Sequence, residues 1–273
     1  MAPDSTAATQ TVVTTAQPPM IRAHALSKVF RSAGSKPVHA LKELDFGIER
    51  GEFISVIGQS GCGKSTLLKI LAGLVRHSSG SLAINGRPID GPSPECAVVF
   101  QSPVLFPWRT VLQNVLLPIE FKRLSVGEYR DRALSILNMV GLQDFVGRYP
   151  YELSGGMQQR VAIARALIQD PSLMLMDEPF GALDAMTREQ MNLELLRLWS
   201  HTKNTVVFIT HSVSEAIFLS DRVIAMTARP GAIAEIVDID LPRPRDLSVI
   251  NTAEFGNYAK RLRKHLQATG AMF

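Results

Sequence analysis

The sequence predicts an α/β fold in which a mostly parallel sheet is covered by helices on both faces. Short apolar runs at 53–57, 173–176 and 205–209 alternate with segments of helical pattern, and this alternation is typical of parallel strands joined by crossover helices. A glycine-rich loop at 58–65 follows the first run and precedes a helical segment. A strand, such a loop and a helix in this order predict a phosphate-loop core.

The other elements are expected in order along the chain. Strand-like runs separated by polar turns such as 32–35 occupy 21–57 and predict an N-terminal antiparallel β region. The helical pattern between about 102 and 167 interrupts the alternation, so we expect an inserted α-helical subdomain there. The remaining predicted segments are helices at 66–74, 111–142 (with a break near 125–127), 154–167, 187–201 and 213–219, and strands at 81–84, 97–100, 173–176 and 205–209.

Length and composition limit what the chain can be. It has 273 residues, 46% of them hydrophobic, which is enough for a packed core. No apolar run approaches the ~18–20 residues that cross a bilayer. The net charge of +4 is compatible with phosphates or an anionic membrane surface, but a diffuse excess of this size does not indicate nucleic acid. The two cysteines, Cys62 and Cys96, make no disulfide framework and suit a reducing compartment.

The two ends of the chain differ from its middle. Residues 1–20 are rich in Ala, Thr and Pro and lack the pattern of a secretory signal, so we expect a disordered tail before a domain at 21–245. Residues 246–273 form a basic extension with Leu262 and Leu266 at helical spacing. This pattern fits either an amphipathic helix on anionic lipid or a solvated terminal helix. The basic residues near this end are Arg243, Arg245, Lys260, Arg261, Arg263 and Lys264.

The loop at 58–65 reads Gly-Gln-Ser-Gly-Cys-Gly-Lys-Ser and matches the G-x-x-x-x-G-K-[ST] pattern. Its glycines let the backbone curl and point N–H groups inward, and the next helix adds its positive N-terminal end. Lys64 can reach the β- and γ-phosphates, and Ser65 is placed to ligate Mg²⁺. The alternative is a plain connecting turn. The residues expected to bind ATP are Gly58, Gln59, Ser60, Gly61, Cys62, Gly63, Lys64, Ser65 and Thr66. We also expect the Cys62 thiol to react with a thiol reagent and to be shielded by ATP.

Two acids, Asp177 and Glu178, follow the apolar run at 173–176. A buried strand that ends in Asp is how phosphate-loop ATPases deliver a carboxylate to the Mg²⁺ shell. Glu178 is then placed to act as a general base on the attacking water. The alternative is an acidic pair that caps a junction between strand and turn.

Residues 153–160 read Leu-Ser-Gly-Gly-Met-Gln-Gln-Arg, and the glycines at a helix start suggest close approach of an anion. An ordinary N-cap serine followed by flexible glycines is the alternative. This segment resembles the signature of the ABC ATPases, whose fold is a RecA-like core with an inserted helical subdomain. Further matches occur in family order at Phe30, Gln101, 181–184 and 210–212. The resemblance covers 21–229.

The resemblance implies roles for several residues and the cofactors ATP and Mg²⁺. Phe30 would stack on adenine, although a core aromatic is the commoner fate of such a residue. Gln101 would sense Mg²⁺ and water, joining Ser65 and, through water, Asp177 in the metal shell. His211 would contact the γ-phosphate, although a lone histidine after a strand is more often structural. It is followed by Ser212, where many relatives carry Asp.

The same resemblance implies a dimer, a homodimer for this chain, because a second subunit closes the nucleotide site. The residues that would contact ATP across the interface are Ser154, Gly155, Gly156 and Asp184. A separate membrane permease would contact residues 102–115, where Leu105, Phe106 and Trp108 are apolar. Local packing within the helical subdomain is the alternative for Trp108.

Two features resemble import ATPases for nitrate, sulfonates and taurine. These are Phe106-Pro107-Trp108 and the turn at 228–231 followed by Leu-Pro-Arg-Pro-Arg at 241–245. The expected protein is therefore an importer subunit for a small anionic solute, peripheral at the cytoplasmic face of the inner membrane. A periplasmic solute-binding protein would complete the complex, and no nucleic acid would be bound. The rival interpretations are a soluble ABC ATPase acting on nucleic acid or the ribosome and a regulatory binding module.

Overall fold

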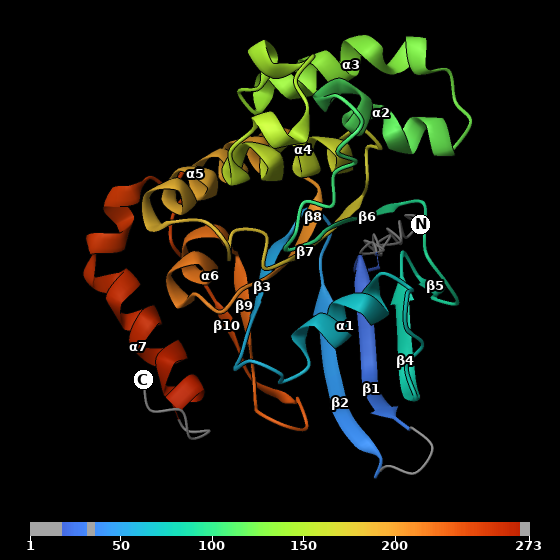
Figure 1. Cartoon of the computed structure of the whole chain (residues 1–273). Coiled ribbons are helices and arrows are strands. Elements are labelled where there is room, and N and C mark those ends of the chain that lie inside the picture. The colour runs from blue at the N-terminus through green and yellow to red at the C-terminus, as the bar shows by residue number, and fades with distance from the viewer. Residues whose placement is uncertain (1–17, 32–35, 268–273) are drawn as a thin grey trace, which may run out of the picture.

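Two β-sheets and a group of helices at one end build the structure, which is a computed structural model (Figure 1). It describes residues 18–31 and 36–267. The expectations for the tail up to residue 17, for the turn at 32–35 and for the last part of the basic extension, 268–273, lie outside the described residues. Among the described residues, no helix combines the length and apolar character that a membrane span requires.

The N-terminal β region forms an antiparallel sheet with the order β2-β1-β4-β5. In β1, Ile21 lies opposite Ile48 of β2 on one side and Ile84 of β4 on the other, and Phe30 ends β1 opposite Val38. Its strands are β1 (Ile21–Phe30), β2 (Val38–Ile48), β4 (Ser79–Ile84) and β5 (Arg87–Pro88).

The second sheet has six strands in the order β10-β9-β3-β8-β7-β6. All its strand pairs are parallel except β10 with β9. Because parallel strands end at one edge, the residues after β3, β7 and β8 meet there. The strands are β3 (Phe53–Ile57), β6 (Cys96–Val99), β7 (Leu173–Asp177), β8 (Thr205–Ile209), β9 (Arg222–Met226) and β10 (Ile233–Asp238).

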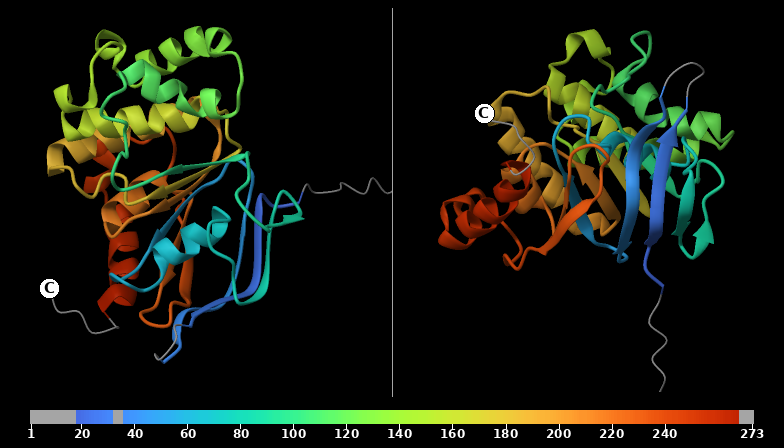
Figure 2. Two further views of the ribbon diagram at one scale, coloured as in Figure 1. Left: turned by 45° about the vertical axis from the view of Figure 1, so that its right-hand side comes forward. Right: turned by 90° about the horizontal axis from the view of Figure 1, so that it is seen from below.

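The helices divide into those on the sheets and those of the inserted segment. Three helices, α2, α3 and α4, gather at one end of the molecule (Figures 1 and 2). Figure 2 also shows α7 on the opposite side of the molecule from β1 and β2. The helices are α1 (Lys64–Leu71), α2 (Val111–Phe121), α3 (Val126–Met139), α4 (Gly155–Leu167), α5 (Ala185–Thr202), α6 (Val213–Leu219) and α7 (Ala253–Gln267). Short 3₁₀ turns lie at Gln143–Phe145, Pro150–Glu152 and Leu247–Asn251.

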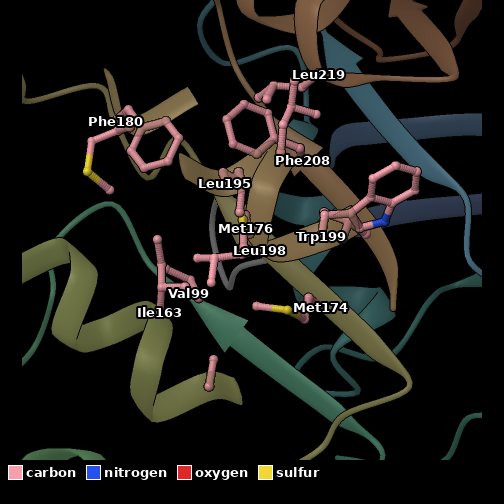
Figure 3. Close-up of a cluster of buried hydrophobic side chains, with 14 of the residues drawn as sticks. Val99, Ile163, Met174, Met176, Phe180, Leu195, Leu198, Trp199, Phe208 and Leu219 are labelled. Atoms are coloured by element: carbon pink, nitrogen blue, oxygen red, sulfur yellow. The ribbon is translucent and has the colours of Figure 1, made fainter. Parts of the chain in front are cut away.

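Two hydrophobic clusters lie on the two faces of the parallel sheet. In one cluster, side chains of α1 pack between this sheet and the antiparallel sheet. The other contains Phe208, whose ring centroid lies 6.0 Å from that of Phe53 and 5.8 Å from that of Phe180, and Trp199 meets Phe53 edge-on at 5.8 Å. Figure 3 shows Ile163 of α4 next to Val99 in the same cluster. The predicted α/β fold, with its phosphate-loop core, N-terminal antiparallel β region and inserted helices, is confirmed.

The C-terminal helix α7 packs on the core, which overturns the idea that it presents an apolar face to lipid. Phe255, Ala259 and Leu262 are buried in the cluster that contains Phe208. The 3.6-residue period of an amphipathic helix cannot by itself distinguish a lipid surface from a protein core. Here the core covers the apolar side of α7.

Arg245 is a second departure from the expected basic extension. Its guanidinium is 7% exposed and donates to the carbonyl oxygens of Ile217, Phe218 and Ser220 at the end of α6. Burial lowers the pKa of Arg245 to about 10. Arg245 therefore satisfies the last carbonyl groups of α6 and adds no charge to an exposed basic surface.

Strands β9 and β10 were not among the predicted elements, and together they form a hairpin at one edge of the parallel sheet. Helix α1 begins at Lys64, two residues before the predicted start, and ends at Leu71 rather than at residue 74. It ends early because Gly73 takes a left-handed φ of 71° and turns the chain. The other predicted helices and strands are present with small shifts of their ends.

Candidate active site

The glycine-rich loop joins β3 to α1 and encloses the side chain of Lys64. Lys64 is 5% exposed, and its ammonium donates to the carbonyl oxygens of Gly58 at 2.8 Å and Gln59 at 3.1 Å. Gly63 has a φ of 110°, and a Cβ atom on it would lie 2.8 Å from the carbonyl oxygen of Ala40. Only glycine fits this position, because both the backbone angle and the contact exclude a side chain.

The two acids stand at the end of β7, directly opposite the loop. Ser65 Oγ donates to Asp177 Oδ1 at 3.1 Å. The pKa of Asp177 is raised because the desolvation of its carboxylate outweighs the hydrogen bond from Ser65. A hydroxyl and a carboxylate oxygen at this separation are the hard oxygen donors that Mg²⁺ prefers.

Glu178 has the unusual backbone geometry that is often found at functional sites. Its φ is 45°, and its N–H donates to the carbonyl oxygen of Ile209 at 3.0 Å. A non-glycine residue in this conformation is strained, and the strain is retained where a fixed side-chain direction matters. His211 Nδ1 lies 3.5 Å from Glu178 Oε2, so the end of β8 meets the end of β7 here.

A cleft of about 620 Å³ brings together most of the residues predicted to bind the nucleotide within one chain, but not Gly58, Gln59, Cys62 or His211. The predicted residues that line it are Phe30, Ser60, Gly61, Gly63, Lys64, Ser65, Thr66, Gln101, Asp177 and Glu178. Phe30 is 43% exposed, so it is not the core aromatic of the alternative interpretation. The Lys28 ammonium lies 4.8 Å from the centroid of its ring.

The four residues predicted to contact ATP across a dimer interface lie outside this cleft, at the starts of two helices. Ser154 caps α4 by accepting from the N–H of Met157, and Asp184 caps α5 by accepting from the N–H of Thr187 at 3.1 Å. The segments adjoin, because a Cβ atom on Gly156 would lie 3.0 Å from the side chain of Thr187. Gly155 and Gly156 form the first turn of α4. Within one chain, Ser154 therefore makes the contact of an ordinary N-cap serine.

Two loop residues point away from the cleft. The Cys62 side chain is 1% exposed and belongs to the cluster that contains α1. The expectation of a reactive thiol shielded by ATP is therefore wrong, because the pattern of the loop fixes the backbone and does not show which side chains turn toward the core. The Gln59 side chain donates to the carbonyl oxygen of Leu266 in α7 at 2.9 Å.

Arg229 and His39 also line the cleft, and sequence analysis did not identify them as site residues. Arg229 lies in the turn between β9 and β10, and its Nε is 3.4 Å from the carbonyl oxygen of Gly61. The only signal in the sequence was the Ala-Arg-Pro-Gly turn at 228–231. The sequence of that turn predicts a loop, but it does not predict that this loop lies beside the glycine loop.

A glycine loop around a buried lysine, a serine–aspartate pair and a strained glutamate define a phosphate-loop ATPase. A family model described as ABC transporter matches residues 41–181, more than half of the chain. The chain belongs to the ABC transporter family and is an ATPase of that family.

Curated relatives and a solved structure resemble the chain over most of its length. It is 49% identical to a taurine import ATP-binding protein of Pelagibacter ubique, over 76% of this chain and 78% of the relative. It is 46% identical to an aliphatic sulfonates import ATP-binding protein of Bacillus cereus, over 81% and 86%. A dimeric ATP-binding cassette in a post-hydrolysis state with ADP and Pi has a TM-score of 0.71 at 34% identity, and the match covers 82% of this chain and 100% of that one.

Proposed function

We propose that this chain is the ATP-hydrolysing subunit of an importer for a small anionic solute, such as taurine, another sulfonate or nitrate. The observation that carries this proposal is the close similarity to relatives named for taurine and aliphatic sulfonate import. A separate permease would conduct the solute, and a periplasmic solute-binding protein would select it. The chain would lie at the cytoplasmic face of the inner membrane. A role on nucleic acid has no support in either the site or the relatives.

The proposed ATPase domain spans 21–245, with the inserted subdomain at about 102–167. The predicted residues of its cleft would bind the nucleotide and Mg²⁺. Phe30 would stack on adenine, and the glycine loop with Lys64 would hold the phosphates. Ser65, Gln101 and, through water, Asp177 would hold Mg²⁺, which neutralises charge on the β- and γ-phosphates when bound. The proximity of Ser65 Oγ to Asp177 Oδ1, 3.1 Å, supports this assignment.

Glu178 is proposed to accept the proton of the attacking water, with His211 beside it at the γ-phosphate. The 3.5 Å separation of Glu178 Oε2 and His211 Nδ1 supports a shared position at the reacting phosphate. The φ of 45° at Glu178 fixes the direction of its side chain. Proton acceptance from a positioned water accelerates such reactions by about 10²–10⁴.

A second copy of this chain is proposed to complete the site. Ser154, Gly155, Gly156 and Asp184 lie together but outside the cleft of their own chain. Ser154 and Gly155 are exposed at the positive N-terminal end of α4, which suits contact with a phosphate of the partner's nucleotide. ATP would then favour the closed dimer, and its hydrolysis would release it.

The region at 102–115 is proposed to contact the permease, mainly through the segment at 102–110 that precedes α2. Trp108 is 71% exposed and stacks on Phe106 with a centroid distance of 5.1 Å, so local core packing does not explain it. Hydrogen bonds to a buried side chain fix the backbone of this segment. The buried Asn114 accepts from the N–H of Phe106 and donates to its carbonyl oxygen. Arg165 of α4 donates to the carbonyl oxygens at 103 and 104. A preorganised segment with an exposed tryptophan stacked on a half-buried phenylalanine is typical of a docking site.

Replacing Trp108 by Ala should weaken assembly with the permease without affecting the isolated subunit. An exposed aromatic anchor at an interface centre is worth ~2 kcal/mol or more, which is about a 30-fold loss of affinity. Co-purification from membranes and the melting temperature would both be measured. Phe121→Ala is the matched control, since Phe121 is 74% exposed on α2 outside the segment. Equal retention of the permease by Trp108→Ala and the control would remove the segment from the interface.

Reconstitution tests the proposed function. The chain would be purified with the permease and solute-binding protein encoded beside its gene and placed in liposomes. Taurine and an aliphatic sulfonate should each be tested for accumulation driven by ATP, with glucose as a neutral control solute. Uptake of an anionic solute and stimulation of ATP hydrolysis by its loaded binding protein are expected. ATP hydrolysis stimulated by nucleic acid, with no solute transported, would overturn the proposal.

A further inference from the structure

The turn between β9 and β10 is fixed against the glycine loop and β2. The N–H of Gly231 donates to the carbonyl oxygen of Ala40 at 3.0 Å, and the N–H of Lys42 donates to that of Gly231 at 2.9 Å. A Cβ atom on Gly231 would lie 2.0 Å from the carbonyl oxygen of Cys62, so this glycine permits the close approach. Within the turn, Thr227 exchanges hydrogen bonds with Ala232 at both its backbone and its hydroxyl.

This fixed turn places the side chain of Arg229 over the glycine loop. Its Nε lies 3.4 Å from the carbonyl oxygen of Gly61, and its Nη2 lies 2.8 Å from where a Cβ atom on Gly61 would be. Arg229 lines the same cleft as Lys64, Phe30 and His39. Within the described part of the chain, Arg229 has no carboxylate partner.

We propose that Arg229 binds a phosphate of the nucleotide from beside Gly61 of the glycine loop. A guanidinium presents several donors in a planar fork, which matches phosphate oxygens, and it keeps its charge at every working pH. Lys64 would reach the β- and γ-phosphates from within the loop. Arg229 lies against Gly61 in the loop that would hold the phosphates, so it is positioned for a phosphate that ATP and ADP share. It would therefore hold ATP and ADP alike.

The contact would also tie nucleotide binding to the β9–β10 hairpin, at the edge of the parallel sheet away from the helical subdomain. This inference rests on the proposed nucleotide site, but it assigns a cationic residue outside the phosphate-loop motif. Because the turn is anchored by backbone hydrogen bonds, a change of the Arg229 side chain should leave its position unaltered.

Titration of purified full-length protein with ATP, ADP and adenosine tests the inference. Arg229→Ala should raise the Kd for ATP and for ADP by about tenfold, the loss of one charge-assisted phosphate contact. It should leave adenosine binding and the melting temperature unchanged. Arg229→Lys should retain part of the affinity, since it keeps the charge and loses the fork. Arg130→Ala, the same change at an exposed site on α3, should behave as wild type.

Three results would decide against the inference. Unchanged Kd values for ATP and ADP in Arg229→Ala would show that the guanidinium does not bind phosphate. An equal loss of adenosine affinity would place its contact at the base or ribose instead. The same loss in Arg130→Ala would mean that net charge alone is responsible. Failure of wild-type protein to bind ATP would instead reject the nucleotide site itself.

Discussion

The Lys64→Ala variant is expected to lose nearly all affinity for ATP. Lys64 is 5% exposed inside the glycine loop, and its ammonium donates to the carbonyl oxygens of Gly58 and Gln59. In the nucleotide complex it would donate instead to the β- and γ-phosphates, and hydrogen bonds to charged groups contribute about 1.5–3 kcal/mol each. Two such bonds correspond to an increase in Kd of about 10² to 10⁴. Isothermal titration with ATP would measure it.

The loss must be separated from damage to the loop, because Lys64 also bonds its backbone. Lys69→Ala removes the same charge from the exposed side of the same helix and should leave the Kd nearly unchanged. Comparing the melting temperatures of both variants shows whether α1 remains folded. ATP binding of wild-type strength in a folded Lys64→Ala protein would contradict the assignment of the phosphate loop.

The Glu178→Gln variant is expected to bind ATP normally and to hydrolyse it about 10²–10⁴ times more slowly, since glutamine cannot accept the proton. Glutamine has nearly the same shape, so the backbone at φ 45° and the contact with His211 can be kept. Phosphate release under saturating ATP would measure turnover.

The control for this variant is Glu128→Gln, at an exposed position of α3, which should turn over as wild type does. The Kd for ATP of Glu178→Gln, measured by calorimetry, would then distinguish a slower hydrolysis step from weaker ATP binding. Normal turnover by Glu178→Gln would remove Glu178 from the role of base and would leave another group to activate the water.

Most of the fold could be predicted because local pattern and tertiary position agree. Strand β8 (Thr205–Ile209) is buried at every position, and a continuous apolar run bounded by polar residues predicts such a strand. Strand β10 (Ile233–Asp238) was missed because it lies at the sheet edge with alternating partial burial and acidic residues. The sequence predicts that α7 is a helix, but it does not predict what the apolar side of this helix contacts. The helical spacing of Leu262 fits a lipid surface and a protein core equally well.

The candidate site was predictable where a motif fixes backbone geometry, as in the loop ending at Lys64 and Ser65 and the acids after β7. Side-chain direction within the loop was not, because Cys62 turns into the core while its neighbours line the cleft. Arg229 was missed because it is 168 residues from Gly61 in the chain. The pairing of β9 with β3 and the hydrogen bonds of Gly231 with β2 bring its turn to the glycine loop.

Two copies of this chain are proposed to form the complete ATP site, with Ser154, Gly155, Gly156 and Asp184 facing the partner's nucleotide. The most direct test is the mass of Glu178→Gln in solution, measured by light scattering with ATP and with ADP. With ATP we expect twice the 29.9 kDa of one chain, and with ADP we expect the mass of a single chain. A Glu178→Gln protein that binds ATP and remains a single chain at micromolar concentration would contradict this proposal.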